Sequence, residues 1–356
     1  MRIGIDAREL GGRATGVGRF LGGLLREWSK SSFAGAHEFV LYTPEPLAIA
    51  LDSRQFRTRL MAGSSGTWWE QVRLPQLVAD DDLDVFFAPA YTAPLGTRVP
   101  TVAAIYDLSF VAHPEWFRLR EGVRRRWLTG RTAAHARAVI TLSEFSRGEI
   151  IERLGVPGDR VHVIVPGIDR LSVTSDARAD PRVLYVGSIF NRRHVPDLIR
   201  AVAALADVSL DIVGDNRTFP YEDLDGIITS LQLEGRVRWH RYVAPDRLLE
   251  LYGRARAFAF LSEYEGLGMT PIEALGTGIP PVVFDTAVSR ESCGVAAIYV
   301  PMGDRPALVR ALQAALFDEP TRARILAEAS AALEKYDWPR AARDTLRVIE
   351  SAAGSG

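Results

Sequence analysis

The chain has only one cysteine, Cys293, among its 356 residues. A single thiol excludes an internal disulfide framework and fits a reducing compartment. Lysine is also scarce, since it occurs only at positions 30 and 335, so arginine carries nearly all of the positive charge. No apolar run approaches the roughly 18 residues that a membrane-spanning helix needs. Residues 1–6 lead directly into a strand pattern without a signal peptide. We therefore expect a cytoplasmic protein that at most rests on a membrane surface.

Neither sign of charge is in excess, because 43 Lys and Arg residues face 44 Asp and Glu residues, for a formal net charge of −1. Domains that bind nucleic acid usually carry a marked positive excess, so we expect no nucleic-acid partner. At 356 residues, the chain exceeds the size at which one hydrophobic core usually stops growing. Its length therefore favours two domains.

The sequence alternates short apolar runs with amphipathic segments, which predicts βα units and parallel sheets, an α/β fold. In the first half we expect strands at 2–6, 38–42, 83–87, 101–105, 138–142 and 160–165, and helices at 18–30, 68–78, 121–136 and 144–154. A polar passage at 171–181 has no apolar period and predicts a linker. Further strands are expected at 183–186, 209–213, 237–241, 257–261 and 281–284, with helices between them.

These segments predict a first domain over residues 1–170 and a second over 178–338. Doubly wound sheets bind ligands at the carboxyl ends of their strands, so we expect the site in a cleft between the two domains. Pro339 interrupts a helical stretch near the end of the chain, and the helix resumes beyond it over 340–352.

Residues 262–274 read SEYEGLGMTPIEA and lead from an apolar strand through a glycine-rich turn into a helix. Pro271 belongs in the first helical turn, where a missing N–H group costs nothing. Backbone N–H groups of the turn can converge at the helix N-terminus and bind an anion, those of Gly266, Gly268 and Met269. Glu265 precedes the turn and Glu273 lies within the helix. Carboxylates beside an anion site suit a ligand with hydroxyl and phosphate groups, such as a nucleotide sugar.

The spacing of Glu265 and Glu273 resembles the E-x7-E motif of retaining glycosyltransferases of the GT-B fold, family 4, and YEGLG at 264–268 resembles that family's YEGFG segment. Other family-like motifs follow the family's order, namely TGVGRF at 15–20, LSEFS at 142–146 and VGS at 186–188. The resemblance covers nearly the whole chain. It implies a GT-B fold, with two doubly wound Rossmann-like domains facing a cleft, the first binding the acceptor and the second the nucleotide sugar.

The resemblance also implies that the last helix, 339–356, returns to the first domain, whereas the simpler alternative is that it only caps the second domain. It implies roles on the donor side as well. Glu273 would hold the ribose hydroxyls, and Glu265 would hold the sugar together with the N–H groups of Gly266, Leu267, Gly268 and Met269. The base would lie near Asp215 and against Tyr242 and Val243.

A second chemical site follows the strand ending at Val186. Gly187 opens a loop that contains Arg192 and Arg193. Guanidinium groups match phosphate oxygens with two hydrogen bonds and stay charged. The family has Arg followed by Lys here and binds the donor diphosphate with them, while His194 stands where Asn is frequent. The alternative is an ordinary solvated basic turn.

The N-terminal loop at 11–18 is also rich in glycine, which lets the backbone approach a phosphate closely. It is not a dinucleotide fingerprint, because the G-x-G-x-x-G spacing fails at Leu21. With the family's motif order, we expect Gly16 and Gly18 near the donor diphosphate. A structural turn is the alternative.

The chain departs from the family at Tyr106, because many relatives have a His that contacts the donor sugar before the Asp that corresponds to Asp107. A phenol can hydrogen-bond a sugar hydroxyl but cannot act as a base as histidine does near neutral pH. We expect Tyr106, Asp107 and His113 on the sugar or acceptor side, with Asp107 among the catalytic candidates beside Glu265, Arg192 and Arg193. His113 and His135 also fit ordinary structural roles.

We expect no catalytic metal. Asp82-Leu83-Asp84 resembles the DxD motif of metal-dependent glycosyltransferases, but the segment fits a helix end that leads into a strand. The arginines and helix dipoles would neutralise the leaving diphosphate instead.

Residues 116–131 combine six arginines with an apolar stripe formed by Trp116, Leu119, Val123 and Trp127. Such a helix can lie on an anionic membrane. The alternative is a solvated helix whose stripe packs inward.

The resemblance, which is closest to the mannosyltransferase-like branch of bacterial polysaccharide synthesis, thus implies a retaining hexosyltransferase. It would move a hexose, with mannose from GDP-mannose as our choice, from a nucleoside diphosphate sugar to a glycan or lipid-linked saccharide. It needs no cofactor beyond the donor. Two alternatives stay open, a nucleotide-sugar epimerase of GT-B-like fold and a noncatalytic nucleotide-sugar-binding subunit.

Overall fold

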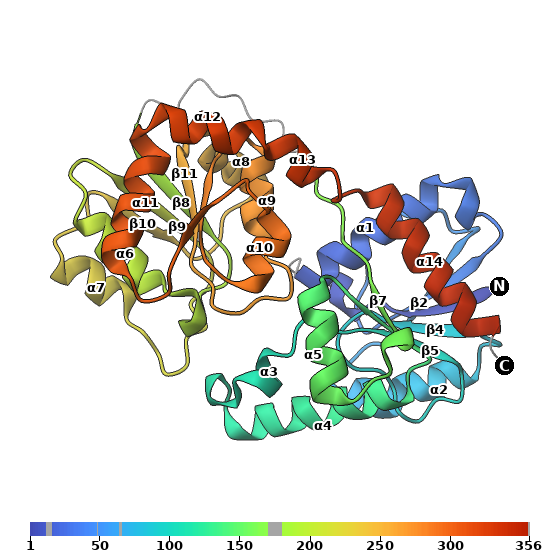
Figure 1. Cartoon of the computed structure of the whole chain (residues 1–356). Coiled ribbons are helices and arrows are strands. Elements are labelled where there is room, and N and C mark those ends of the chain that lie inside the picture. The colour runs from blue at the N-terminus through green and yellow to red at the C-terminus, as the bar shows by residue number, and fades with distance from the viewer. Residues whose placement is uncertain (12–15, 48, 64–65, 170–179, 355–356) are drawn as a thin grey trace. The chain divides into compact units, whose positions relative to one another are not determined.

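The computed structural model describes residues 1–11, 16–47, 49–63, 66–169 and 180–354. The described residues form two compact units. Unit 1 consists of Met1–Pro114, Leu119–Gly167 and Tyr336–Gly356, whereas unit 2 consists of Glu115–Arg118 and Ile168–Lys335. Each unit is built on a parallel sheet with helices on both faces, which confirms the predicted α/β class (Figure 1).

The unit boundaries differ from the predicted ones. The first stretch of unit 1 ends at Gly167 rather than at 170, and the unit resumes at Tyr336 rather than at 339. The short segment Glu115–Arg118 belongs to unit 2, which the sequence did not indicate. Most of the predicted linker lies outside the described residues, because 170–179 are not among them.

In the described part of unit 1, the sheet has seven strands in the order β3-β2-β1-β4-β5-β6-β7. They are β1 (Arg2–Asp6), β2 (Glu38–Thr43), β3 (Phe56–Leu60), β4 (Val85–Ala88), β5 (Thr101–Ala104), β6 (Ala138–Thr141) and β7 (Val161–Val163). Strand β3 was not predicted. It is an edge strand in which only Phe56 is buried, so its sequence lacks the apolar run that marks a central strand.

Alternate residues of β2 explain how unit 1 is layered, because successive side chains of a strand point to opposite faces. Phe39 and Leu41 pack with α1 (Gly16–Lys30) and α14 (Trp338–Gly354). Val40 and Tyr42 pack on the other face, against a π-helical turn (Trp69–Arg73) and α2 (Leu74–Ala79). The remaining helices of this unit include α3 (Ser109–Ala112), α4 (Leu119–His135) and α5 (Glu144–Leu154).

Helix α14 is an integral part of unit 1. Its Ala341, Leu346 and Ile349 are buried in the same core as α1 and the sheet. The indole Nε1 of Trp28 donates a hydrogen bond of 2.9 Å to the carbonyl oxygen of Ala342. The C-terminal helix therefore packs in the unit where the resemblance to the family implied it would lie.

In the described part of unit 2, the sheet has six strands in the order β10-β9-β8-β11-β12-β13. They are β8 (Arg182–Val186), β9 (Ser209–Val213), β10 (Val237–His240), β11 (Ala257–Phe260), β12 (Pro281–Phe284) and β13 (Ile298–Val300). The helices are α6 (Val195–Ala203), α7 (Leu224–Ser230), α8 (Pro245–Arg254), α9 (Met269–Gly276), α10 (Ala287–Cys293), α11 (Arg305–Phe317), α12 (Glu319–Ala327) and α13 (Ala329–Leu333). Strand β13 was not predicted, because its three residues are too short to show a pattern.

Both strand orders contain a switch point, where the chain leaves one strand and later returns to its other side. In unit 1 the switch point lies between β1 and β4, and in unit 2 between β8 and β11. The loops that follow these neighbouring strands diverge at the carboxyl edge of the sheet and leave a crevice that commonly binds ligands. A ligand site is therefore expected at the switch point of each unit.

Candidate functional site

The turn between β11 and α9 lies at the switch point of unit 2. Gly268 is the N-cap of α9 and has left-handed backbone angles, φ 78° and ψ 68°, which glycine adopts without strain. Met269 is the first residue of α9, and Pro271 lies in its first turn, as predicted. The first N–H groups of a helix have no partner within the helix and carry its positive dipole end. Gly266, Leu267, Gly268 and Met269 therefore lie together beside an anion-favouring helix terminus.

The loop after β8 meets the loop after β11 through an ion pair between Arg193 and Glu265, whose side chains are only 13% and 14% exposed. Nη2 and Nε of Arg193 lie 2.7 and 2.8 Å from Oε1 of Glu265. The same oxygen accepts a hydrogen bond of 2.8 Å from the hydroxyl of Ser262. Nη1 of Arg193 donates to the carbonyl oxygen of Ser188 at 2.7 Å. The contact joins residues 72 positions apart because β8 and β11 are neighbours in the sheet.

The ion pair between Arg193 and Glu265 keeps both side chains ionised. Burial alone would raise the pKa of Glu265, but the positive charges of Arg193 and Arg192 outweigh burial and lower that pKa. Burial would likewise lower the pKa of Arg193, whereas Glu265 and Tyr185 raise it above its usual value. Burial also raises the pKa of the neighbouring Tyr185 to about 12. At neutral pH the site thus holds an ionised carboxylate and an ionised guanidinium.

Arg192 is held differently from Arg193. Its Nε donates a hydrogen bond of 3.2 Å to the carbonyl oxygen of Tyr264. Its guanidinium carbon lies 4.5 Å from the ring centroid of Phe190 and 5.8 Å from that of Trp116. The guanidinium is therefore oriented by aromatic faces rather than by a carboxylate, and it contributes positive charge to the loop.

Gly187 is required by the geometry of this loop. Its φ of 146° is unfavourable for other residues, and a Cβ atom there would lie 2.9 Å from Nη1 of Arg193. We predict that Gly187→Ala lowers the stability of the protein by about 1–3 kcal/mol through backbone strain. It should also displace Arg193.

The control for Gly187→Ala is Gly148→Ala. Gly148 lies within α5, and a Cβ atom there would meet no atom within 4 Å. Alanine should stabilise that helix by up to about 1 kcal/mol. Thermal unfolding of both variants measures the difference. Equal melting temperatures for the two would contradict the strain argument.

His194 links this loop to the start of α6. Its backbone is left-handed, with φ 47° and ψ 37°, a conformation that Asn tolerates better than most residues. The backbone conformation thus suits the Asn that the resemblance to the family leads us to expect here. The imidazole Nδ1 lies 3.1 Å from Oδ2 of Asp197, and Nε2 contacts the carboxylate of Glu263. His194 thus ties the two loops together from a second side.

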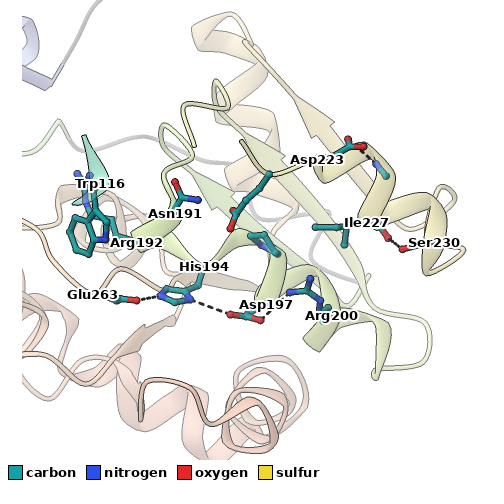
Figure 2. A pocket seen from close by; sticks show the side chains of 13 residues that line it. Trp116, Asn191, Arg192, His194, Asp197, Arg200, Asp223, Ile227, Ser230 and Glu263 are labelled. Atoms are coloured by element: carbon teal, nitrogen blue, oxygen red, sulfur yellow. Dashed lines mark hydrogen bonds and ion pairs between the residues drawn. The ribbon is translucent and has the colours of Figure 1, made fainter. Parts of the chain in front are cut away.

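A pocket of about 610 Å³ adjoins the site (Figure 2). Figure 2 shows Arg192 and Trp116 at one end of it, the pair formed by Glu263 and His194 along one side, and Ile227 at the other end. Arg193, Glu265 and Glu273 do not line it. The pocket therefore lies beside the residues that the sequence predicted and shares only Arg192 with them.

The remaining donor-side residues lie in or near the same edge of unit 2. Glu273 is a buried residue of α9. Tyr242 follows β10 and is exposed, and Val243 next to it is half-buried. Asp215 follows β9 and pairs with Arg217 at 3.5 Å. The carboxyl ends of four neighbouring strands thus supply the predicted donor-side residues, whose individual roles stay predictions.

Tyr106 in unit 1 is held by contacts within that unit. The residue is buried, and its ring packs edge-on against Phe20 and Tyr91. Its hydroxyl donates a hydrogen bond of 2.5 Å to the carbonyl oxygen of Pro89, and burial raises the pKa of the phenol well above its usual value. The single proton of this hydroxyl is therefore used inside unit 1. A role of Tyr106 on the sugar side stays a prediction.

Asp107 is half-buried and already accepts two hydrogen bonds, from the hydroxyl of Tyr91 at 2.7 Å and from the N–H of Ser109 at 2.9 Å. His113 is half-buried and follows α3. His135 is exposed at the end of α4, where its Nδ1 contacts the carbonyl oxygen of Arg131 at 2.8 Å. Asp107 and His113 stay predictions for the acceptor side.

The glycine loop is described only in part. Gly16 opens α1, two residues earlier than predicted, and Gly18 is buried in its first turn. Residues 12–15 of the loop lie outside the described residues. Whether Gly16 and Gly18 face a diphosphate stays a prediction.

The switch point of unit 1 holds a charged cluster that the sequence analysis missed. Nη2 of Arg8 lies 2.9 Å from Oδ2 of Asp6 and 2.9 Å from Oε1 of Glu70. The hydroxyl of Thr92 also donates to Glu70, at 2.5 Å. Burial raises the pKa of Asp6 to about 6 although Arg8 opposes the shift. The only sequence signal was an acidic residue at the end of the first strand.

Two of the aspartates at 80–84, Asp81 and Asp84, hold parts of unit 1 together. Asp81 is buried and accepts a hydrogen bond from the hydroxyl of Tyr42 at 2.9 Å and from Nε of Arg59 at 3.1 Å. Asp84 accepts from the N–H of Arg2 at 2.7 Å. Across the described residues, His, Cys, Asp and Glu side chains do not gather in groups of three that would hold a metal ion. Within the same residues, no helix is long and apolar enough to cross a bilayer.

Two family profiles match the chain. The profile described as Glycosyltransferase Family 4 matches residues 14–170. The profile described as Glycosyl transferases group 1 matches residues 173–331. Together they cover most of both units.

Among curated proteins, the chain is similar to the O-antigen chain mannosyltransferase B of Escherichia coli, with 25% identity over 236 residues that cover 60% of this chain and 61% of the relative. It is also similar to the O-antigen chain mannosyltransferase RfbU of Salmonella typhimurium, with 23% identity over 259 residues that cover 73% of this chain and 72% of the relative. The first match thus spans about six tenths of the relative's length.

Among solved structures, the chain is similar to Anabaena Alr3699/HepE in complex with UDP and glucose, with a TM-score of 0.77 over 99% of this chain and 100% of that chain. The two sequences are 21% identical over this match. At that level of identity the likeness shows a shared fold.

Proposed function

Because the chain belongs to the family 4 glycosyltransferases of the GT-B fold, we propose that it transfers a hexose from a nucleoside diphosphate sugar to an acceptor hydroxyl. The observation that carries the proposal is the contact between Arg193 and Glu265 at the switch point of unit 2. It joins two motifs that the sequence connected with the donor, beside the N-terminus of α9.

In this proposal, different residues of unit 2 bind different parts of the donor. Arg192 and the N-terminus of α9 meet the diphosphate, and their positive charge stabilises it as it leaves, without a metal ion. Arg193 keeps Glu265 ionised and oriented, and Glu265 receives hydroxyls of the sugar. Glu273 holds the ribose, and Tyr242 and Val243 lie against the base. This differs from the sequence interpretation in giving Arg193 mainly a positioning role.

The reaction we propose retains the configuration of the sugar. The acceptor hydroxyl attacks the anomeric carbon from the face on which the diphosphate leaves, the C–O bond to the diphosphate breaks, and the departing phosphate oxygen takes the acceptor's proton. The family motif E-x7-E supports retention. Asp107 and His113 are proposed on the acceptor side.

Mannose is our proposed sugar and GDP-mannose our proposed donor. Mannosyltransferase relatives support this choice, whereas the UDP and glucose of the structural neighbour favour testing uridine nucleotides as well. The O-antigen relatives support a glycan or a lipid-linked saccharide as the acceptor.

A thermal-shift panel tests the donor site. The panel contains GDP-mannose, UDP-glucose, UDP-N-acetylglucosamine, dTDP-rhamnose and NAD. A nucleotide sugar at a hundred times its Kd should stabilise the protein by about 2.7 kcal/mol. Arg192→Ala should lose that shift, while Arg310→Ala, which changes an exposed arginine of α11, should retain it. A shift with NAD alone, or no shift with any nucleotide sugar, would refute the proposal.

A further inference from the structure

Helix α4 presents apolar side chains to solvent rather than to the core. Leu119, Val123 and Trp127 are 78%, 49% and 59% exposed. Their spacing of four residues places them in one line along the helix. The residues of α4 that are buried are different ones, Gly122, Leu128, Thr129, Thr132 and Ala133. The interpretation that the apolar stripe packs inward is therefore wrong for these three residues.

A second apolar pair lies beside this line. Trp68 is 58% exposed and Val72 is 42% exposed. The two segments are joined where Nη1 of Arg124 in α4 donates a hydrogen bond of 2.8 Å to the hydroxyl of Thr67. We call the surface formed by Leu119, Val123, Trp127, Trp68 and Val72 the α4 face. All of its residues belong to unit 1, and α4 runs along the lower edge of that unit in Figure 1.

Positive charge surrounds the α4 face. Between Leu119 and His135, α4 has five arginines and one acidic residue, Glu121. Glu121 is itself paired with Arg125 at 2.8 Å. Arg120, Arg124 and Arg131 are exposed along the helix. The guanidinium carbon of Arg73 lies 5.0 Å from the ring centroid of Trp68. The combination is an exposed apolar line, with tryptophan at two points, inside a rim of long cationic side chains.

We propose that the α4 face docks on the surface of a bilayer that contains anionic lipids. A helix in this position inserts Leu and Trp side chains at the boundary between headgroups and acyl chains, while arginines extend to the phosphates. From Leu119 to Trp127 the line is about 12 Å long, at about 1.5 Å per residue. In the proposed docking the helix axis lies parallel to the membrane plane, because all three side chains then reach the same depth. The charge favours an anionic lipid surface over a protein partner. Helix α4 has four more positive than negative side chains, and anionic headgroups present negative charge alone.

This proposal does not rest on the proposed glycosyl transfer, because it concerns binding in the absence of any donor or acceptor. The test is cosedimentation of the intact protein with vesicles of phosphatidylcholine alone and with vesicles that contain about 30% phosphatidylglycerol. Binding should be strong only to the anionic vesicles and should weaken as salt screens the charge. The double variant Leu119→Gln/Trp127→Gln should reduce binding about tenfold or more.

Two control variants distinguish binding through the α4 face from nonspecific adsorption of the protein to vesicles. Val295→Gln/Phe317→Gln removes two exposed apolar side chains of unit 2 and should leave binding unchanged. Arg120→Gln/Arg131→Gln should weaken binding at least about tenfold, since each arginine near an anionic surface contributes about fivefold. Arg310→Gln/Arg347→Gln, which changes exposed arginines elsewhere, should have little effect. Circular dichroism and thermal melts would confirm that all variants are folded.

Wild-type protein that fails to bind anionic vesicles, or that binds them equally well with the α4 face changed, would overturn the proposal. A protein interface is the other occupant that such a face could have. If Leu119→Gln/Trp127→Gln converts an oligomer to a monomer while vesicle binding is absent throughout, the face joins copies of the chain and the membrane proposal is wrong.

Discussion

Arg192→Ala is expected to lower kcat/KM by about 100- to 1000-fold. That is the usual effect of removing one preorganised group that stabilises charge in a transition state. Arg192 is suited to this role because its guanidinium is oriented by Phe190 and by the carbonyl oxygen of Tyr264, not neutralised by a carboxylate. Initial rates with the donor identified in the thermal-shift panel would measure the change.

The control for Arg192→Ala is Arg310→Ala, since Arg310 is an exposed residue of α11. It should retain the activity of the wild type. A loss in kcat/KM of less than about threefold for Arg192→Ala would mean that Arg192 does not meet the diphosphate. A rise in KM with an unchanged kcat would instead show that Arg192 binds donor and transition state equally.

Arg193→Ala is expected to destabilise unit 2 by about 3–5 kcal/mol, because it leaves the carboxylate of Glu265 buried without its partner. For a unit of this size, that loss corresponds to a fall of roughly 6–20 °C in its melting temperature. Adding Glu265→Gln to Arg193→Ala should restore part of the stability, because the unpaired buried charge is then gone. Differential scanning calorimetry of both variants measures the difference.

A matched control uses an exposed ion pair of the same unit. Nε of Arg290 lies 2.7 Å from Oδ1 of Asp285, a distance like that between Arg193 and Glu265, but both side chains are largely exposed. Arg290→Ala should change the melting temperature little, since exposed pairs are weak. Equal losses for Arg290→Ala and Arg193→Ala would show that burial of Glu265 is not the cause.

The pair formed by Arg193 and Glu265 also predicts a pH dependence. The pKa of Glu265 is lowered in the folded protein, so its contribution to stability is fully present above the ordinary carboxyl pKa of about 4.3. The contribution is lost as the pH falls below that value, through the lowered pKa of the folded state. Glu265→Gln should lack this part of the acid-induced loss of stability. An unchanged acid profile in that variant would contradict the assignment.

The alternation of apolar runs was enough to predict two parallel α/β units, because central strands buried on both faces read as continuous apolar segments. It could not predict β3, whose exposed polar residues lie at the sheet edge, or β13, which has only three residues. The predicted helix at 68–78 begins as a π-helical turn, a distinction that periodicity over one turn cannot make. Local pattern thus predicted the central elements and missed the edges.

The motif around Glu265 and Gly268 was predictable because the turn and the helix start are local in sequence. The partner of Glu265 was not, since the contact with Arg193 depends on β8 and β11 lying side by side. Burial was the other property that sequence did not supply. Tyr106 proved to be buried, and Trp127 proved to be exposed, although both belong to mixed polar and apolar segments.

The placement of α14 in unit 1 has a consequence for how the protein is made. All of unit 2 from Ile168 onward leaves the ribosome before α14 does. At about 5–20 residues per second, that interval is roughly ten seconds or longer. Until then, the part of the unit 1 sheet face that Ala341, Leu346 and Ile349 cover is not yet packed against α14. The unit that begins first is therefore completed last, and the part of its apolar sheet face that α14 covers stays exposed while unit 2 folds.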